Sequence, residues 1–210
     1  MSIAVLLVNI TVASNFFPVL AAAYNYRRLD SVMKLMALFC LVSVLPDAAS
    51  PIFKVHNSLP LMHLFDLLAV AFFTMIYCKV FYKPVLKTIT LILGGVSASV
   101  MIGNVFFIEG PFVYPSISNT VLSLFLVPLS LIYFYQLLSR QEFVHIEKQP
   151  LFWINAGVLF YYAVNIFLFM LYTRINSAER NDYYMLQSVT NIIANLLFSV
   201  GLLCKPQKTT

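Results

Sequence analysis

The chain has 210 residues, of which 61% are hydrophobic and only 10% are charged, and its mean hydropathy is +0.88. A soluble domain carries about 25% charged residues, so this composition excludes a water-covered globular fold and indicates an integral membrane protein. The net charge of +5 comes from basic residues at the ends of apolar segments, which excludes a basic patch for nucleic acid.

Seven apolar runs follow one another along the chain, and each is long enough for a helix to cross about 30 Å of hydrocarbon. We therefore predict an all-α, polytopic bundle of seven transmembrane helices that forms a single domain over residues 1–210. A re-entrant run would reduce the count to six. The predicted spans lie near 3–24, 32–53, 59–82, 88–108, 117–138, 151–173 and 183–203.

The basic residues predict the orientation of these spans, because positive charge favours the cytoplasmic side of a membrane. Three of them, Lys54, Arg174 and Arg180, fall on one side of the predicted spans. The other side holds Arg27, Arg28, Lys34, Lys79, Lys83, Lys87, Arg140, Lys148, Lys205 and Lys208. We therefore predict a multi-pass protein of the inner (cytoplasmic) membrane, with its N-terminus outside and its C-terminus in the cytoplasm.

Two carboxylates fall inside apolar runs, Asp47 in the second and Asp66 in the third. A charge at the bilayer centre costs about 2.5–3.5 kcal/mol, so such a side chain normally faces the protein interior and has a partner. At a rise of about 1.5 Å per residue, both lie roughly 9–10 Å below the predicted outer boundary. His63 precedes Asp66 by three residues, which places both on one helical face.

Side-chain amides collect at similar depths in the other predicted spans. The amides are Asn104, Asn119, Asn165, Gln187, Asn191 and Asn195. The last three recur every four residues and therefore form one polar stripe on a helix. Because this polar set is biased toward the outer half, we predict an outward-facing pocket that binds a ligand or senses protons, with Asp47 and Asp66 at its charge centre. The alternative is that these groups only join helices, through hydrogen bonds that average about 0.6 kcal/mol.

The fourth predicted span contains the segment "GGVSASVMIGN", in which Gly95, Ser99 and Gly103 stand at four-residue steps. A stripe of small residues lets another helix approach closely. We predict that this stripe packs against a helix of the same bundle; the alternative is the face of a homodimer.

Several chemistries are excluded by the residues that they require. The seventh span has no lysine, so a retinal Schiff base cannot form, and we predict no cofactor. His56 and His145 fall on opposite sides of the membrane, and we predict no metal. The chain has no glycine-rich phosphate loop and no serine-nucleophile elbow. A membrane-embedded enzyme that uses Asp47 and Asp66 as an acid–base pair remains open.

Three segments, "MHLFDLLAVAFFTMIYCKVF", "SLIYFYQLLSR" and "PLFWINAGVLFYYAVNIFLFML", resemble small, uncharacterised seven-helix membrane proteins of bacteria. The likeness extends from about Val32 to Leu203 and consists of aromatic-rich spans, short loops and sparse buried polar groups. The resemblance implies the seven-helix fold, and it assigns no functional residue.

With no sequence left for a catalytic or output domain, we predict a receptor-like or accessory sensory protein that signals through a partner. The expected partner is a membrane signalling protein such as a sensor kinase, and the expected surroundings are membrane lipid. A ligand or proton bound outside would act by binding one bundle state more tightly than another. The alternative is a membrane-embedded enzyme, or a carrier of small solutes or protons, that uses Asp47 and Asp66.

Overall fold

The computed structural model describes residues 3–49, 55–139, 146–172 and 180–204, and within these ranges every regular element is a helix. The prediction of an all-α fold is therefore confirmed. In chain order the helices are α1 (Ile3–Ser14), α2 (Phe16–Asn25), η1 (Tyr26–Arg28), α3 (Ser31–Ala49), α4 (Val55–Val80), α5 (Pro84–Phe107), α6 (Ser116–Leu138), η2 (Ile146–Lys148), α7 (Pro150–Leu171) and α8 (Arg180–Leu203).

Six segments of the described chain are long and apolar enough to cross a membrane. They are Leu6–Arg28, Leu59–Val80, Pro84–Phe107, Ser116–Leu138, Pro150–Met170 and Asp182–Leu203. Helix α3 contributes a shorter apolar stretch, Ser31–Pro46. The outer surface is apolar as well: Phe107 is 88% exposed and Leu138 is 71% exposed. Lipid rather than water is the solvent that such a surface requires. The chain is a multi-pass membrane protein.

The first apolar segment is divided into α1 and α2 at Asn15. Pro18 has no N–H group and cannot donate to the carbonyl of Ser14, four residues earlier, so the helical ladder is interrupted there. The Ser14 hydroxyl turns back and donates to the carbonyl of Thr11 at 2.7 Å, and the Thr11 hydroxyl donates to the carbonyl of Leu7 at 2.9 Å. Both Ser14 and Asn15 are buried, and they face α8.

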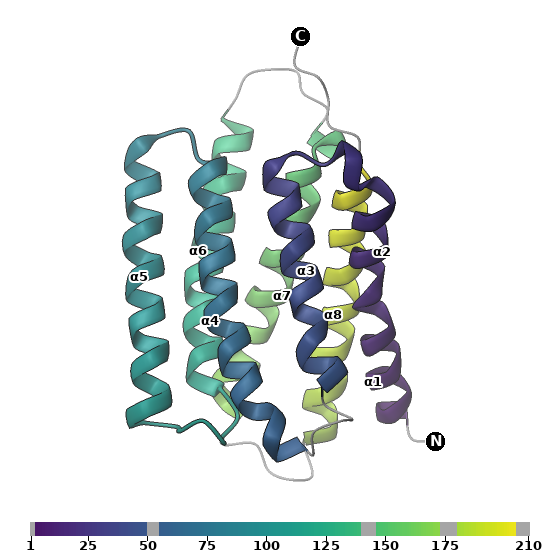
Figure 1. Cartoon of the computed structure of the whole chain (residues 1–210), viewed down its shortest axis with the longest axis vertical. Helices are drawn as coiled ribbons and strands as arrows, with labels where there is room; N and C mark the ends of the chain where they lie inside the picture. Colours follow the sequence, from purple (N-terminus) through teal and green to yellow (C-terminus); the bar gives the residue numbers. More distant parts are fainter. Residues whose placement is uncertain (1–2, 50–54, 140–145, 173–179, 205–210) are drawn as a thin grey trace.

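The helices run up and down between two ends of the bundle, and the two chain termini lie at opposite ends (Figure 1). Helix α8 packs between α7 and the α1–α2 pair, whereas α4 packs against α3, α5 and α6. Helix α5 lies at the edge, beside α4 and α6. The end that holds Lys79, Lys83, Lys87 and Lys148 is called the basic end below, and the opposite end is called the N-terminal end.

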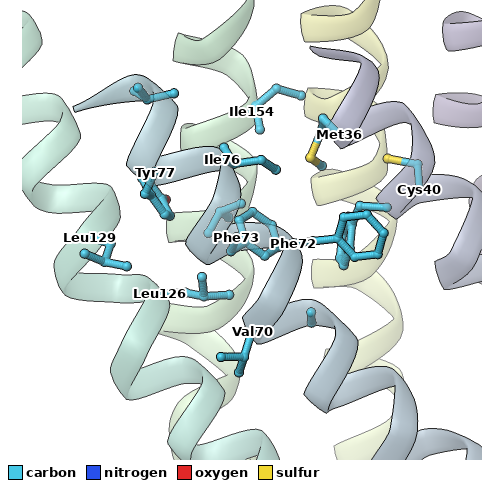
Figure 2. Packing of buried hydrophobic residues seen from close by; sticks show 14 of the residues in the cluster. Met36, Cys40, Val70, Phe72, Phe73, Ile76, Tyr77, Leu126, Leu129 and Ile154 are labelled. Atoms are coloured by element: carbon cyan, nitrogen blue, oxygen red, sulfur yellow. The ribbon is translucent and has the colours of Figure 1, made fainter. Parts of the chain in front are cut away.

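The apolar core is centred on α4. Its residues Val70, Phe73 and Tyr77 recur at helical spacing on one face, and all three are at most 2% exposed. Figure 2 shows this face packing between Leu126 and Leu129 of α6 and other buried side chains of the cluster. Phe73 also meets Phe39 of α3 edge to face, with ring centroids 4.9 Å apart. These contacts orient α4, and therefore its polar residues, toward the bundle interior.

The small-residue stripe of α5 lies on the outer face of the bundle instead of at a contact within it. A Cβ added at Gly95 or Gly103 would meet nothing within 4 Å, and Ser99 is exposed. The glycine that packs closely is Gly94, where an added Cβ would collide with the Thr74 side chain of α4. We expected Gly95, Ser99 and Gly103 to pack against a helix of the same bundle, but the close contact is made by Gly94, one residue before the stripe. The homodimer face stays a prediction.

Candidate functional site

Helix α4 carries the two most informative polar residues, His63 and Asp66, one turn apart near the N-terminal end. His63 is 7% exposed and Asp66 is 4% exposed, so neither faces lipid. This burial agrees with the cost of placing a charge in hydrocarbon. Helix α4 presents this face to the bundle because its core residues Val70 and Phe73 pack inward.

Asp66 has titratable groups around it from two other parts of the chain and from its own helix. Glu109 and Tyr114, in the connection between α5 and α6, both interact with it electrostatically. Tyr162 of α7 does so as well. His63, on the same helix as Asp66, is the fourth titratable neighbour. The site therefore combines two carboxyl groups, one imidazole and two phenols at the N-terminal end.

The connection between α5 and α6 is held over this site by several polar contacts. Gly110 adopts a φ of 76°, a left-handed conformation that glycine accepts without a steric penalty. The Glu109 carboxylate then reaches the start of α6 and accepts the N–H of Ile117 at 3.0 Å. It also accepts the side-chain amide of Asn104 at 2.6 Å. A carboxylate at this position satisfies a free helix N–H and complements the helix dipole.

His63 of α4 contacts the same connection through a hydrogen bond. Its Nε2 atom lies 3.0 Å from the carbonyl oxygen of Val113. Because a carbonyl can only accept, Nε2 carries the proton and Nδ1 of the neutral ring has the free lone pair. Nδ1 of His63 and Oδ2 of Asp66 are both buried and have no hydrogen-bond partner among the described residues. A buried polar atom without a partner costs about 1–3 kcal/mol. A proton or a ligand that bonded to either atom would remove this cost.

Tyrosines join this connection to the adjacent ends of α7 and α8. The rings of Tyr114 and Tyr172 stack with centroids 3.8 Å apart, and Tyr172 meets Tyr183 edge to face at 5.2 Å. The hydroxyls of Tyr114 and Tyr183 lie 3.2 Å apart. Burial raises the pKa of Tyr114, and the neighbouring phenol of Tyr183 raises this pKa further. The cluster therefore stays neutral and links three parts of the chain at the N-terminal end.

The predicted amides do not gather in one pocket. Asn165 donates to Thr190 at 2.8 Å and joins α7 to α8. Asn195 of α8 donates to Ser14 at 3.0 Å and to Asn191. Asn195 therefore faces the break between α1 and α2.

The remaining predicted residues have separate surroundings. Asn104 contacts Glu109 and Ser118, whereas Asn119 donates to the carbonyl of Pro115 in its own chain segment. Gln187 is half-buried, and its side chain has no hydrogen bond to other described residues. Asp47 lies in α3, and its side chain is outside the described residues. The structure thus places His63, Asp66 and Asn104 around one site and distributes the other amides over helix contacts.

Sequence reasoning missed Glu109 and the buried tyrosines. Glu109 gave no local signal, because it lies eight residues before the Ile117 N–H that it accepts, outside the spacing of a capping box. Tyr114 and Tyr183 stand at the ends of predicted spans, where tyrosine is common because it suits the membrane interface. Their positions at the ends of spans gave no sign that they meet each other.

A second polar group lies deeper in the bundle, on the same face of α4. The Tyr77 hydroxyl donates to Asn155 of α7 at 2.7 Å and lies 2.8 Å from the Ser130 hydroxyl of α6. Tyr162 interacts electrostatically with both Asp66 and Tyr77. Buried polar groups therefore extend from the N-terminal end toward the basic end, along α4 and α7.

Among the described residues, no group of three or more histidine, cysteine, aspartate or glutamate side chains is placed to hold a metal ion. No family model, no curated protein and no solved structure matches the chain. The class defined by the fold is therefore a helical multi-pass membrane protein with a buried carboxyl–imidazole site, and the residues themselves are the basis for assigning its function.

Proposed function

We propose that the protein is a receptor-like or accessory sensory protein of the inner (cytoplasmic) membrane, with seven spans and its N-terminus outside. In this proposal α1 and α2 together form the first span and α3 forms the second. The lysines of the basic end, including Lys79, Lys83 and Lys87, support a cytoplasmic location for that end. The site around Asp66 then faces the outer leaflet.

The observation that carries the proposal is the pair of unpartnered atoms on adjacent turns of α4. Oδ2 of Asp66 and Nδ1 of His63 are buried without a hydrogen-bond partner in the described part of the chain. Ionisable groups at membrane depth are expensive and are usually retained for a functional reason. A proton or small cationic ligand at this site would satisfy both groups and change their interaction with Glu109, Tyr114 and Tyr162.

The signal would travel along α4 and α7. Tyr162 interacts electrostatically with both Asp66 and Tyr77, and Tyr77 is hydrogen-bonded to α6 and α7. A change at Asp66 therefore has a contiguous set of buried polar contacts through which to bias the helices at the basic end. Two bundle states with different affinity for a ligand suffice for a response. The output would then pass to a membrane signalling protein such as a sensor kinase.

Trp153 provides a test, because it is the single tryptophan of the chain and lies at the basic end of α7. Its indole nitrogen donates to the carbonyl of Glu147 at 2.8 Å. We expect acidification from about pH 8 to about pH 5, the range in which histidine changes charge, to alter its emission in lipid nanodiscs. Asp66→Asn should abolish the change, and Asp182→Asn, which alters an exposed carboxylate, should retain it. An unchanged emission in the parent protein, or an equal change in Asp66→Asn, would refute the proposal.

The buried polar groups along α4 and α7 favour a second candidate, a carrier of protons or small solutes that uses Asp66 together with Asp47. Tyr162 and Tyr77 provide hydroxyls between Asp66 and the basic end, and proton relays in membranes are built from such groups. Proteoliposomes with an internal pH dye distinguish the two candidates. A carrier acidifies the lumen under a pH gradient and stops doing so in Asp66→Asn, whereas a sensor gives no flux in either protein. A membrane-embedded enzyme would instead lose turnover in Asp66→Asn.

A further inference from the structure

A pocket of about 220 Å³ lies at the basic end, where α3, α4, α6 and α7 meet. Its apolar lining consists of Val32, Val80, Leu137 and Leu151, one residue from each of these helices. Pockets for drug-sized ligands occupy about 300–1,000 Å³, so this one suits a single chemical group or a lipid headgroup. It is separate from the Asp66 site, which lies at the other end of the bundle.

Polar groups from two helices and from the residue before a third line the pocket. Lys79 comes from the last turn of α4, Gln136 from the last turns of α6, and Gln149 from the residue that precedes α7. None of these three side chains has a hydrogen bond or ion pair with another residue of the described ranges. Tyr82 and Tyr133 add two phenols to the lining. An ammonium and two amides supply several hydrogen-bond donors, the set that an oxyanion requires.

The electrostatic setting of the pocket also favours an anion. Lys83, Lys87 and Lys148 lie at the same end, and the described acidic residues there are Asp30 and Glu147. Helix α7, of 22 residues, begins at Pro150 beside the pocket, and the positive end of its dipole is therefore directed toward it. The pocket lining is partly apolar and partly polar. A ligand that has an apolar part next to its charged group would contact both kinds of lining residue.

We infer that this pocket binds a phosphate group, which an anionic phospholipid of the adjacent leaflet carries or which is free in solution. Lys79 neutralises the phosphate, Gln136 and Gln149 donate to its oxygens, and the apolar lining contacts the glycerol part of a lipid. Basic pockets between membrane helices are known to bind such headgroups. The inference is independent of the sensory function, and binding would hold even if Asp66 proved to have no signalling role.

The test uses the full chain purified in a neutral detergent and titrated with dihexanoyl phosphatidylglycerol, dihexanoyl phosphatidylcholine or inorganic phosphate, with binding followed by thermophoresis. Lys79→Gln should weaken binding of the anionic ligand about tenfold, because a hydrogen bond to a charged group is lost. Lys83→Gln is the matched control, since it removes the same charge at the same end from a residue outside the pocket lining. Gln136→Leu should also weaken binding, although it leaves the net charge unchanged.

The outcomes separate the two sources of phosphate. Saturable binding of phosphatidylglycerol that inorganic phosphate does not displace identifies a lipid site, and displacement by inorganic phosphate identifies a site for free phosphate. The inference is overturned if phosphatidylcholine binds as tightly as phosphatidylglycerol, if neither anion binds, or if Lys83→Gln weakens binding as much as Lys79→Gln. Thermal unfolding of each variant shows that it is folded, and Gln136→Leu decides the result if Lys79→Gln does not fold.

Discussion

Nε2 of His63 lies 3.0 Å from the carbonyl oxygen of Val113 and thereby joins α4 to the connection between α5 and α6. The contact bridges 50 residues of sequence. It also determines which nitrogen of the ring is protonated, because only a protonated Nε2 can donate to a carbonyl. The remaining nitrogen, Nδ1, is buried and has no hydrogen-bond partner among the described residues.

Replacement of His63 by phenylalanine should loosen the connection between α5 and α6. The ring volume is kept, but the bond to the Val113 carbonyl is lost. We expect faster hydrogen exchange of the backbone amides from Gly110 to Tyr114, measured by mass spectrometry in detergent. Leu64→Ala, at an adjacent residue of α4 that is 50% exposed, is the control and should leave exchange in this connection unchanged. Equal exchange in His63→Phe and the parent protein would contradict a holding role for His63.

Glu109→Ala should lower the free energy of unfolding by about 1–2 kcal/mol, the range for loss of a helix cap. The substitution removes the acceptor of the Ile117 N–H and of the Asn104 amide. Glu109→Gln should cost less, because one amide oxygen remains and Asn104 can turn its own unpartnered oxygen toward the new NH₂ group. Thermal unfolding in detergent measures both, and an equal loss in the two variants would show that the negative charge, not the hydrogen bonds, is what stabilises this end.

Gly94→Ala and Gly95→Ala should have opposite effects on stability. An added Cβ at Gly94 collides with the short, β-branched side chain of Thr74, whose hydroxyl is bonded to the carbonyl of Val70. Overpacking of this kind costs about 1–3 kcal/mol. At Gly95 nothing lies within 4 Å, and alanine is the better helix former by about 1 kcal/mol. Unfolding in detergent compares the two, and similar midpoints would show that α4 and α5 separate at little cost.

Tyr114→Phe should reduce the loss of stability at alkaline pH. Burial raises the pKa of Tyr114 in the folded protein, whereas an unfolded tyrosine ionises near pH 10. The unfolded state therefore releases its proton first, so the stabilising contribution is complete below about pH 10 and decreases as the pH rises above that value. We expect the unfolding midpoint to fall less between about pH 8 and about pH 11 in Tyr114→Phe than in the parent protein. Tyr24→Phe, at a residue that is 88% exposed, should behave like the parent protein.

The sequence by itself determined the solvent, the class of fold and the inward direction of the buried charges. Hydrophobicity and helical periodicity are local properties, so apolar runs and the shared face of His63 and Asp66 can be read from neighbouring residues. The uneven distribution of lysine and arginine is equally local, and it is the ground for the proposed orientation. The break at Asn15 was not predicted, although Pro18 was a signal for it.

Only the tertiary structure decided which polar groups meet. The Tyr77 hydroxyl reaches Ser130 across 53 residues and Asn155 across 78, and the Asn195 amide reaches Ser14 across 181. Such contacts depend on the rotation of each helix about its axis, which is set by the packing of its whole surface rather than by any short segment. For the same reason the outward face of Gly95 and the pocket beside Lys79 could not be predicted from the chain, since both result from which helices become neighbours.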